Sequence, residues 1–490
     1  MESFYLMVLL ILPLIFSIIS LLSGKYSKVI SSILAGLFII IVLPFLPVIN
    51  YSLFNPETLY GISVNLEISY LSYPLVLLTS IVIFIAMIYQ DGRIEKSYFS
   101  YLFFLEFSLI GVFMSQNLIL FYIFWELVLI PSYFMILRWG GPKKDYTALK
   151  FLIYTHVGSV LMLVSIFILG YNYYSLTGHF NFNIGTLITN QFLSNLSPLL
   201  MFLVMMGFFL AFFIKLPTVP FHTWAPDVYV ESPTTSSMVF SGLLSKMGAF
   251  GLFSIFIRFV PFSGPDVGYF LLSLALLSIV YAAFAALAQK DLKRMVAYSS
   301  IGHMGFITLA ISIVFLAPVL NLPVSDAYLA LEGGMFMMFA HGLIVPILFG
   351  SVGSIERSTG TRAIRDLGGL TKMMPNLAFV MVAGFLASLG LPGMAGFVAE
   401  FSVVVGSWYF ITYLSFIVIF GLVVVASYHI WALQRTLFGP YNEYLGKIGD
   451  MLPREFWPMI ILVLVVIIVG IFPSPVYSMF SHYAQFIGGM

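Results

Sequence analysis

Apolar stretches long enough to cross a bilayer recur from one end of this chain to the other, with only short polar breaks between them. A membrane-spanning helix needs about 20 apolar residues. Of the 490 residues, 61% are hydrophobic and 8% are charged, and the charged share is roughly a third of that in an ordinary soluble domain. No room is left for a separate soluble domain, so we predict a single all-α polytopic membrane domain over residues 1–490.

Uninterrupted apolar runs predict about fourteen transmembrane helices. They lie near residues 3–22, 29–49, 70–90, 100–115, 117–137, 149–170, 198–216, 233–257, 267–288, 294–316, 326–350, 376–409, 411–433 and 455–478. We group them as three N-terminal helices (3–99), a first repeat (100–257), a second repeat (267–433) and a last helix (455–478). The stretch 4–22 has no basic region before it and no small-residue cleavage site after it. It is therefore predicted to be a retained helix and not a signal peptide.

Most of the 21 basic residues fall in or beside loops that follow odd-numbered helices. These residues are Lys25, Lys28, Arg93, Lys96, Arg138, Lys143, Lys144, Lys150, Lys290, Lys293, Arg294, Arg357, Arg362, Arg365, Lys372, Arg435, Lys447 and Arg454. Only Arg258 falls on the opposite side, while Lys215 and Lys246 lie within spans. Because cytoplasmic loops carry an excess of Lys and Arg, we predict a multi-pass protein of the cell membrane with both termini on the outer side.

Two predicted helices are interrupted in similar ways, helix 7 at 215–220 (KLPTVP) and helix 12 at 390–396 (GLPGMAG). Proline removes a backbone donor, and irregular backbone is tolerated at membrane depth only beside protein or a wet cavity. Paired interruptions five helices apart indicate two inverted repeats, helices 4–8 and 9–13, with an ion site at each break. The alternative interpretation is a pair of simple proline kinks.

Several predicted helices carry ionisable residues near mid-membrane, where a charge costs about 2.5–3.5 kcal/mol even on the mildest scale. The main candidates are Glu126 in helix 5, Lys215 in helix 7, Lys246 in helix 8 and Glu400 in helix 12. The remaining candidates are His303 in helix 10, His341 in helix 11, Glu106 in helix 4, and Glu332, which lies nearer the outer end of helix 11. For each one, the alternative is a structural ion pair or hydrogen bond between helices. We interpret His156, His179, His222 and His429 as structural or interfacial.

This mixture of carboxylates, amines and imidazoles suits a proton relay. An opposite charge favours the ionised form of a group and desolvation opposes it, so separating a buried pair changes proton affinity. A histidine, with a pKa of about 6.5, can pass a proton in either direction. A sodium path would instead present converging oxygen ligands, and no such cluster is visible. The chain has no Cys, its seven His lack the spacing of a zinc or haem site, and its net charge of +1 gives no sign of nucleic-acid binding.

At these residues the chain resembles the antiporter-like proton-pumping subunits of respiratory complex I, and most closely the M (NuoM-type) chain. The matching stretches are 121–136 (FYIFWELVLIPSYFMI), 215–252 (KLPTVPFHTWAPDVYVESPTTSSMVFSGLLSKMGAFGL), 290–306 (KDLKRMVAYSSIGHMGF), 340–342 (AHG), 389–401 (LGLPGMAGFVAEF) and 433–440 (LQRTLFGP). They run from helix 4 to helix 13. The resemblance implies a subunit without cofactors of its own, with quinone, iron–sulfur clusters and flavin held by partner subunits. It also implies partners that include other antiporter-like membrane chains, and contact with lipid.

The resemblance further implies roles for individual residues. Glu126 and Lys215 correspond to the helix 5 and helix 7 pair, and Lys246 to the helix 8 lysine. His303 and His341 continue the central axis, and Glu400 takes the outlet position, which is Lys in the L and N relatives. Glu106 matches an acid of M-type chains, and Glu332 a position that is acidic in only some relatives. The absence of a long lateral helix after helix 14 also favours the M type over the L type.

The resulting hypothesis is a proton-translocating subunit of an NADH (or other donor):quinone oxidoreductase in a respiratory electron-transport chain. Protons reach Lys246 from the cytoplasmic side through the helix 7–8 region. Opening of the Glu126–Lys215 pair drives transfer by way of His303 and His341 to Glu400, with release outside. The alternatives are a subunit of a multisubunit sodium/proton antiporter or of a membrane-bound hydrogenase, a stand-alone solute transporter, and a purely structural membrane subunit.

Overall fold

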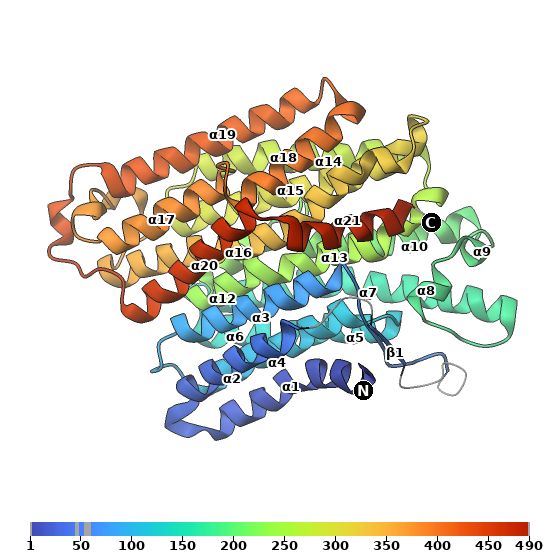
Figure 1. The fold of residues 1–490 in the computed structure, drawn as a ribbon, viewed down its shortest axis with the longest axis horizontal. Helices are drawn as coiled ribbons and strands as arrows, with labels where there is room; N and C mark the ends of the chain where they lie inside the picture. Colours follow the sequence, from blue (N-terminus) through green and yellow to red (C-terminus); the bar gives the residue numbers. More distant parts are fainter. Residues whose placement is uncertain (1, 45–48, 53–59, 489–490) are drawn as a thin grey trace.

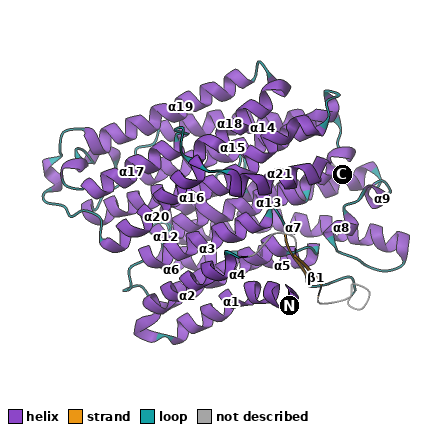
Figure 2. Ribbon diagram, viewed as in Figure 1, coloured by secondary structure: helices purple, strands orange, loops and turns teal. Residues whose placement is uncertain are grey.

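A computed structural model describes residues 2–44, 49–52 and 60–488 of the chain. The molecule is a bundle of helices that run in roughly the same line, with the N- and C-termini at one end (Figure 1). Nearly all of the ribbon is helical (Figure 2). In the described part of the chain, the two strands β1 and β2 form one small sheet. Within the described residues, thirteen helices are long and apolar enough to cross a membrane. The prediction of an all-α polytopic membrane protein is confirmed.

The N-terminal part contains the first helices and the two strands. Its elements are α1 (Glu2–Leu22), the 3-10 turn η1 (Gly24–Tyr26), α2 (Ser27–Val42), β1 (Ile49–Ser52), β2 (Asn65–Ile68), α3 (Ser72–Tyr89), α4 (Lys96–Met114), α5 (Leu118–Leu127), α6 (Leu129–Trp139) and α7 (Lys144–Thr177). The strands pair antiparallel, with Ile49 opposite Ile68.

The middle of the chain contains short helices and the first broken span. Its elements are α8 (Ile184–Leu187), α9 (Asn190–Leu193), α10 (Pro198–Lys215), α11 (Trp224–Glu231), α12 (Thr234–Val239), the π-helical turn η3 (Phe240–Leu244), α13 (Ser245–Ser254), the 3-10 helix η4 (Phe256–Phe262) and α14 (Pro265–Leu287).

The C-terminal part contains the two longest buried helices and the second broken span. Its elements are α15 (Leu292–Val319), η5 (Val324–Ala327), α16 (Tyr328–Thr359), η6 (Ile364–Asp366), η7 (Leu370–Lys372), α17 (Pro375–Ser388), α18 (Ala395–Ile411), α19 (Ser415–Leu433), the π-helical turn η8 (Gln434–Phe438), η9 (Glu443–Leu445), α20 (Pro453–Ile471) and α21 (Ser474–Gly488).

Two predicted spans differ from the structure. The span 29–49 was placed too far along the chain, because α2 ends at Val42 and Ile49 already belongs to β1, while residues 45–48 lie outside the described residues. The span 455–478 is wrong as a single helix: α20 ends at Ile471, and α21 begins at Ser474. Pro473 lies between them, and a proline inside a helix removes a backbone hydrogen bond and clashes with the preceding turn.

The two predicted interruptions are present. The first broken span consists of α10 and α11, separated by residues 216–223, and the second of α17 and α18, separated by residues 389–394. Each lies fourth in a run of five predicted helices, which agrees with a repeat, while the repeat boundaries 100–257 and 267–433 stay a prediction.

A third interruption was not predicted, in the span that carries Glu126. There α5 ends at Leu127 and α6 begins at Leu129. Pro131 explains the break, since it has no N–H to donate to the carbonyl of Leu127 four residues earlier. The regular helical hydrogen bonding is therefore interrupted two residues after Glu126.

The helices differ in how deeply they are buried. The apolar windows of α15 and of α16 are entirely buried, whereas less than half of each window is buried in α1, α2, α7 and α20. The two central helices carry His303 and His341. Candidate relay residues therefore occupy the centre of the bundle, away from the lipid-facing surface.

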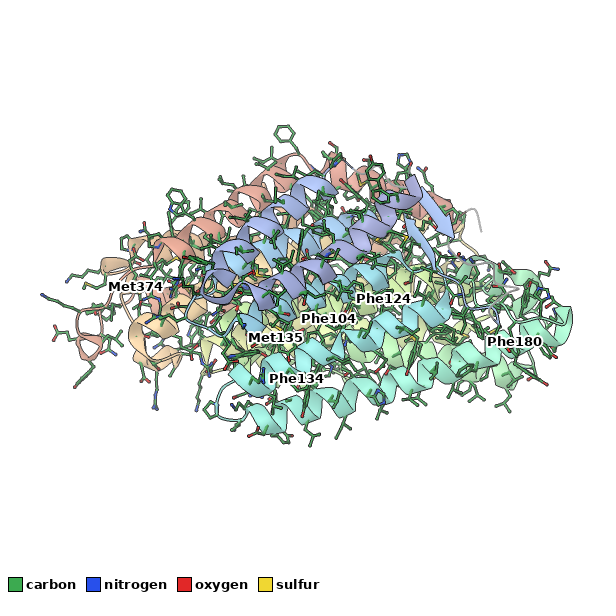
Figure 3. The ribbon with its side chains drawn as sticks, turned by 90° about the horizontal axis from the view of Figure 1, so that it is seen from below. Phe104, Phe124, Phe134, Met135, Phe180 and Met374 are labelled. Atoms are coloured by element: carbon green, nitrogen blue, oxygen red, sulfur yellow. The ribbon has the colours of Figure 1, made fainter. Side chains whose placement is uncertain are left out.

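The connections between spans alternate between the two ends of the bundle. Phe180, which lies between α7 and α8, and Met374, directly before α17, are at opposite ends (Figure 3). The sequence places Phe180 in a loop after an even-numbered helix and Met374 in a loop after an odd-numbered one. The alternation agrees with the predicted helix count, and which end faces the cytoplasm stays a prediction.

Candidate functional site

Lys246 lies fully buried in the continuous helical stretch formed by α12, η3 and α13. The π-helical turn just before it displaces the regular hydrogen bonds of the helix, as such turns commonly do at functional positions. The Lys246 ammonium donates to the carbonyl oxygen of Ser241 at 3.0 Å and to Ser245 Oγ at 3.1 Å. Its third contact is Nδ1 of His341, at 2.7 Å. The charge is thus held entirely by uncharged groups.

His341 joins this lysine to α15. Because a protonated ammonium has only donors, the Nδ1 atom that faces Lys246 acts as an acceptor. The other ring nitrogen, Nε2, then carries the hydrogen and donates to Ser300 Oγ at 3.0 Å. Ser300 Oγ in turn lies 2.9 Å from Ser241 Oγ. The imidazole therefore accepts a hydrogen bond on one side and donates on the other, which is the arrangement that proton transfer through a ring requires.

His303 lies next to His341, with ring centroids 5.3 Å apart. Its Nδ1 atom is 2.9 Å from the carbonyl oxygen of Ser299, and its Nε2 atom is 3.1 Å from that of Ser388. The same Nε2 atom lies 3.3 Å from Oε1 of Glu400. Both ring nitrogens therefore face acceptors, and His303 connects the central helices to the second broken span.

The structure brings four predicted residues into one line, in the order Lys246, His341, His303, Glu400. The predicted order, in which His303 came before His341, is wrong. Position along the chain does not decide it, because α15 and α16 lie side by side and His341 is the residue that contacts the lysine.

Glu400 belongs to the first turns of α18, directly after the break. In that break Gly390 has a φ of +78°, and a Cβ atom there would collide with the carboxylate of Glu400. Glycine meets both demands, since it adopts positive φ readily and leaves room for the carboxylate. The break thus positions the last acid of the line.

The first broken span is held together by hydrogen bonds from its irregular part. Trp224 is fully buried and donates from Nε1 to the carbonyl oxygen of Ile214, at 2.9 Å. The N–H of Val219 donates to Ser278 Oγ at 3.0 Å. These contacts satisfy backbone groups that the end of α10 leaves without helical partners. Lys215, the last residue of α10, is thereby fixed in the interior.

The predicted ion pair between Glu126 and Lys215 is absent from the described residues. Glu126 instead contacts His156 of α7, with Oε2 3.0 Å from Nδ1. The Lys215 ammonium has no hydrogen-bond partner in the described part of the chain, and it lies over the rings of Phe151 (5.3 Å) and Trp125 (5.9 Å). His156, interpreted as structural or interfacial, was not predicted to be the partner of Glu126. The pattern held no signal for it, since His156 and Glu126 lie on different helices.

Glu106 and Glu332 lie apart from the line. Glu106 of α4 is fully buried, and neither carboxylate oxygen has a hydrogen-bond partner among the described residues. Glu332 lies near the start of α16, beside Tyr477 of α21, whose hydroxyl donates to Ser402 Oγ at 3.1 Å. No contact joins either acid to the four-residue line in the described structure.

Polar groups that were not predicted as relay residues lie around the line. Tyr428 donates from its hydroxyl to Ser299 Oγ at 2.8 Å. His429, interpreted as structural, is buried, with Nε2 3.1 Å from Ser388 Oγ. Single Ser, Tyr and His residues carry no spacing that would mark them, so only their positions around His303 reveal them.

Two cavities lie toward opposite ends of the bundle. One, of about 230 Å³, is lined by residues at the junction of α11 and α12, and by Lys293, Glu356 and Arg362. The other, of about 510 Å³, lies at the end that holds Glu67 and Arg258 and reaches Phe250, one helical turn from Lys246. Burial raises the pKa of Glu67, and Arg258 opposes that shift. Among the described residues, no group of three or more His, Asp or Glu could hold a metal ion.

Comparison with known proteins shows which family this chain is similar to. The family described as NADH:quinone oxidoreductase/Mrp antiporter, TM, matches residues 115–426. The chain is 40% identical over 432 residues to F(420)H(2) dehydrogenase subunit M of Methanosarcina mazei, covering 87% of this chain and 84% of the relative. It is 33% identical over 435 residues to NADH-quinone oxidoreductase subunit M of Escherichia coli, covering 87% and 82%.

Among solved structures, a chain of respiratory complex I from Thermus thermophilus with bound NADH has the same fold. The TM-score is 0.87 at 26% sequence identity, over 99% of each chain. The sequence match, the relatives and the shared fold all lead to one assignment: the chain belongs to the NADH:quinone oxidoreductase/Mrp antiporter family of transmembrane subunits.

Proposed function

We propose that this chain is a proton-translocating subunit in the membrane arm of a complex I-like quinone oxidoreductase, which moves protons outward across the cell membrane. The observation that carries the proposal is the buried line from Lys246 through His341 and His303 to Glu400. Its relatives are subunit M of F(420)H(2) dehydrogenase and of NADH-quinone oxidoreductase, which supports a place in an assembly of that kind. Ionisable residues inside membrane helices are a hallmark of proton relays.

In this proposal the electron transfer takes place on other subunits, which hold the quinone, the iron–sulfur clusters and the flavin. The chain contributes translocation to the enzyme and contacts neighbouring antiporter-like membrane chains and lipid. Its own residues bind and pass protons.

Protons enter through the cavity at the junction of α11 and α12, on the side of the basic loops. The cavity is lined by Glu231, Ser232 and Lys293, and the Lys293 ammonium donates to the carbonyl oxygen of Ser232 at 2.6 Å. From this cavity, α12 and η3 lead along one continuous helical path to Lys246. Polar groups around a cavity of this size can hold ordered water.

Movement of the Glu126 carboxylate relative to Lys215 supplies the drive. When the carboxylate approaches, the ammonium is stabilised, and when it withdraws, the buried charge loses its counter-ion and its proton is released. Moving one charge against 100 mV needs about 2.3 kcal/mol. A change of two pKa units is worth about 2.7 kcal/mol. The free energy released when the pair opens is therefore large enough to move one charge across the membrane.

Transfer then follows the order of contacts. Lys246 gives a proton to Nδ1 of His341, whose Nε2 atom gives up its own proton toward His303. His303 passes a proton to the carboxylate of Glu400, from which it leaves on the outer side. Each transfer leaves the donor group one proton short, and the next proton that enters at the Lys246 end restores the line for the following cycle.

The test uses the purified complex in vesicles, with quinone reduction and proton uptake measured together. We expect Lys246→Met to lower the number of protons moved per quinone reduced at least severalfold, and Lys246→Arg, which cannot release its proton, to fail likewise. Lys215→Met and Glu126→Gln should have the same effect, with assembly intact. Glu332→Gln, at an acid outside the line, is the control and should pump normally.

Full proton stoichiometry in Lys246→Met or in Lys215→Met would contradict the proposal. The same vesicles also address the antiporter alternative. Proton movement that needs quinone reduction and persists without sodium supports the proposal, whereas movement that needs sodium and not quinone reduction would overturn it.

A further inference from the structure

His156 occupies an unusual position for an ionisable residue. It lies midway along α7, and its side chain is 53% exposed on the surface of the chain. The same face carries Leu149, Ile153 and Val157, each more than half exposed. A polar ring among apolar residues on the outside of a transmembrane helix costs free energy unless it is paired. The ring is paired, because its Nδ1 atom lies 3.0 Å from Oε2 of Glu126.

Glu126 and Lys215 each have a polar group without a hydrogen-bond partner in the described residues. The second carboxylate oxygen, Oε1, is buried without a hydrogen-bond partner in the described residues, and so is the ammonium of Lys215. Buried unpaired charged groups are costly. Glu126 interacts electrostatically with Lys215 across the intervening space. The Glu126 carboxylate is therefore bonded to His156 and not to Lys215.

We propose that His156 is a positioning residue that holds Glu126 away from Lys215 in the open arrangement, so that the carboxylate alternates between two partners. The inference rests on the proposed function, in which the distance between Glu126 and Lys215 sets proton release. It adds a defined second position for the carboxylate. Without His156, a withdrawn carboxylate would have no partner, and the open arrangement would be less populated.

The backbone beside Glu126 allows such a movement. The span breaks directly after it, at Val128, because Pro131 cannot donate to Leu127. Proline kinks of this kind let a helix bend at one place. Lys150 of α7 does not compete with His156 for the Glu126 carboxylate, because it is already paired with Asp227 of α11, at 2.6 Å.

Three variants of the complete complex test the proposal. His156→Leu removes the hydrogen bond and suits an apolar helix surface, so the span should still insert. His156→Gln keeps an amide that donates to the carboxylate and cannot titrate. His179→Gln is the matched control, because His179 lies in the loop after α7, where its ring contacts the carbonyl oxygen of Thr177 and the ring of Tyr173 and no residue of the proposed switch in the described part of the chain.

We expect His156→Leu to lower protons moved per quinone at least threefold, with His156→Gln restoring most of the loss and His179→Gln unchanged. In a Glu126→Gln background, His156→Leu should have no further effect, since the two residues act through one contact. Infrared difference spectra should show the Glu126 carboxylate band shifted in His156→Leu and near its normal position in His156→Gln.

Normal pumping by His156→Leu would overturn the inference, and so would a loss in His156→Leu that is fully additive with Glu126→Gln. If His156→Leu does not assemble, His156→Gln decides, because a normal carboxylate band and pumping there support a hydrogen-bonding role and a loss of both contradicts it. The outcome is separable from that of the proposed function: Lys215→Met can abolish pumping while His156→Leu leaves it intact.

Discussion

At the scale of single residues, the buried charges of this chain differ in how they are satisfied. Lys246 has three hydrogen-bond partners, whereas Lys215 and Glu106 have none in the described residues. Glu400 has a partner, His303, in the neighbouring helix. A buried charge with incomplete pairing is poised to exchange a proton, because neither protonation state is fully stabilised.

Gly390 is expected to matter through Glu400. In Gly390→Ala the new Cβ atom would displace the Glu400 carboxylate from His303, so protons moved per quinone should fall severalfold in the vesicle assay. Gly393→Ala is the control, because Gly393 also has a positive φ, +92°, while a Cβ there meets nothing within 4 Å. Both variants carry a similar backbone strain of about 1 kcal/mol. Equal pumping by the two variants would show that the space for Glu400 is not what this glycine provides.

At the scale of elements, irregular backbone lies beside the carboxylates and lysines of the site, while His303 and His341 lie inside the continuous helices α15 and α16. Glu126 precedes the break at Val128, Lys215 ends α10, Lys246 follows the π-helical turn η3, and Glu400 follows the break before α18. Irregular turns within the membrane free carbonyl groups and loosen the helix, and they persist only where protein or water satisfies them. In this bundle Trp224 and Ser278 supply such partners.

Pro131→Ala tests the break beside Glu126. Alanine supplies the missing N–H to the carbonyl of Leu127, so α5 and α6 should join into one straight helix. We expect slower amide hydrogen exchange around Val128, a higher melting temperature and fewer protons moved per quinone. Pro13→Ala, in the outlying helix α1, is the control and should change stability without changing pumping. A straightened helix with normal pumping would rule out bending at Val128 as part of the switch.

At the scale of the whole molecule, some charges only hold helices together. Glu455 of α20 is buried and accepts from Arg357 of α16 at 2.6 and 3.0 Å, and from Ser354 at 3.0 Å. Arg357 also donates to the carbonyl oxygen of Asp450 at 2.9 Å. This fully satisfied cluster ties the last long span to the central helix α16, and it lies in no contact with the proton line.

Glu455→Ala should therefore separate stability from function. Removing one partner of a buried pair costs about 3 kcal/mol, so we expect a clearly lower melting temperature with an unchanged proton-to-quinone ratio in the assembled fraction. Asp366→Asn, in the exposed pair with Arg365, should cost at most about 1 kcal/mol. A fall in the pumping ratio of correctly assembled Glu455→Ala would instead assign this carboxylate to the relay.

Much of the fold could be predicted from the sequence, because lipid imposes a simple rule. Only helices about 20 residues long satisfy their own backbone in a bilayer, so apolar runs located the spans, and the prolines and glycines at 215–220 and 390–396 located two of the breaks. The break at Val128 was missed because a single proline, Pro131, also occurs inside continuous membrane helices. The strands β1 and β2 were missed because their residues are few and lie outside the spans.

By itself, the sequence determined which ionisable residues lie inside membrane helices, since the position of a residue within its own span decides its depth. The tertiary structure alone decided which of them touch. It placed His341 against Lys246 and His303 against Glu400, and it gave Glu126 the partner His156 in place of Lys215. The physical reason is that helical spacing defines the face of a side chain on its own helix, whereas the facing residue depends on how neighbouring helices are packed and rotated.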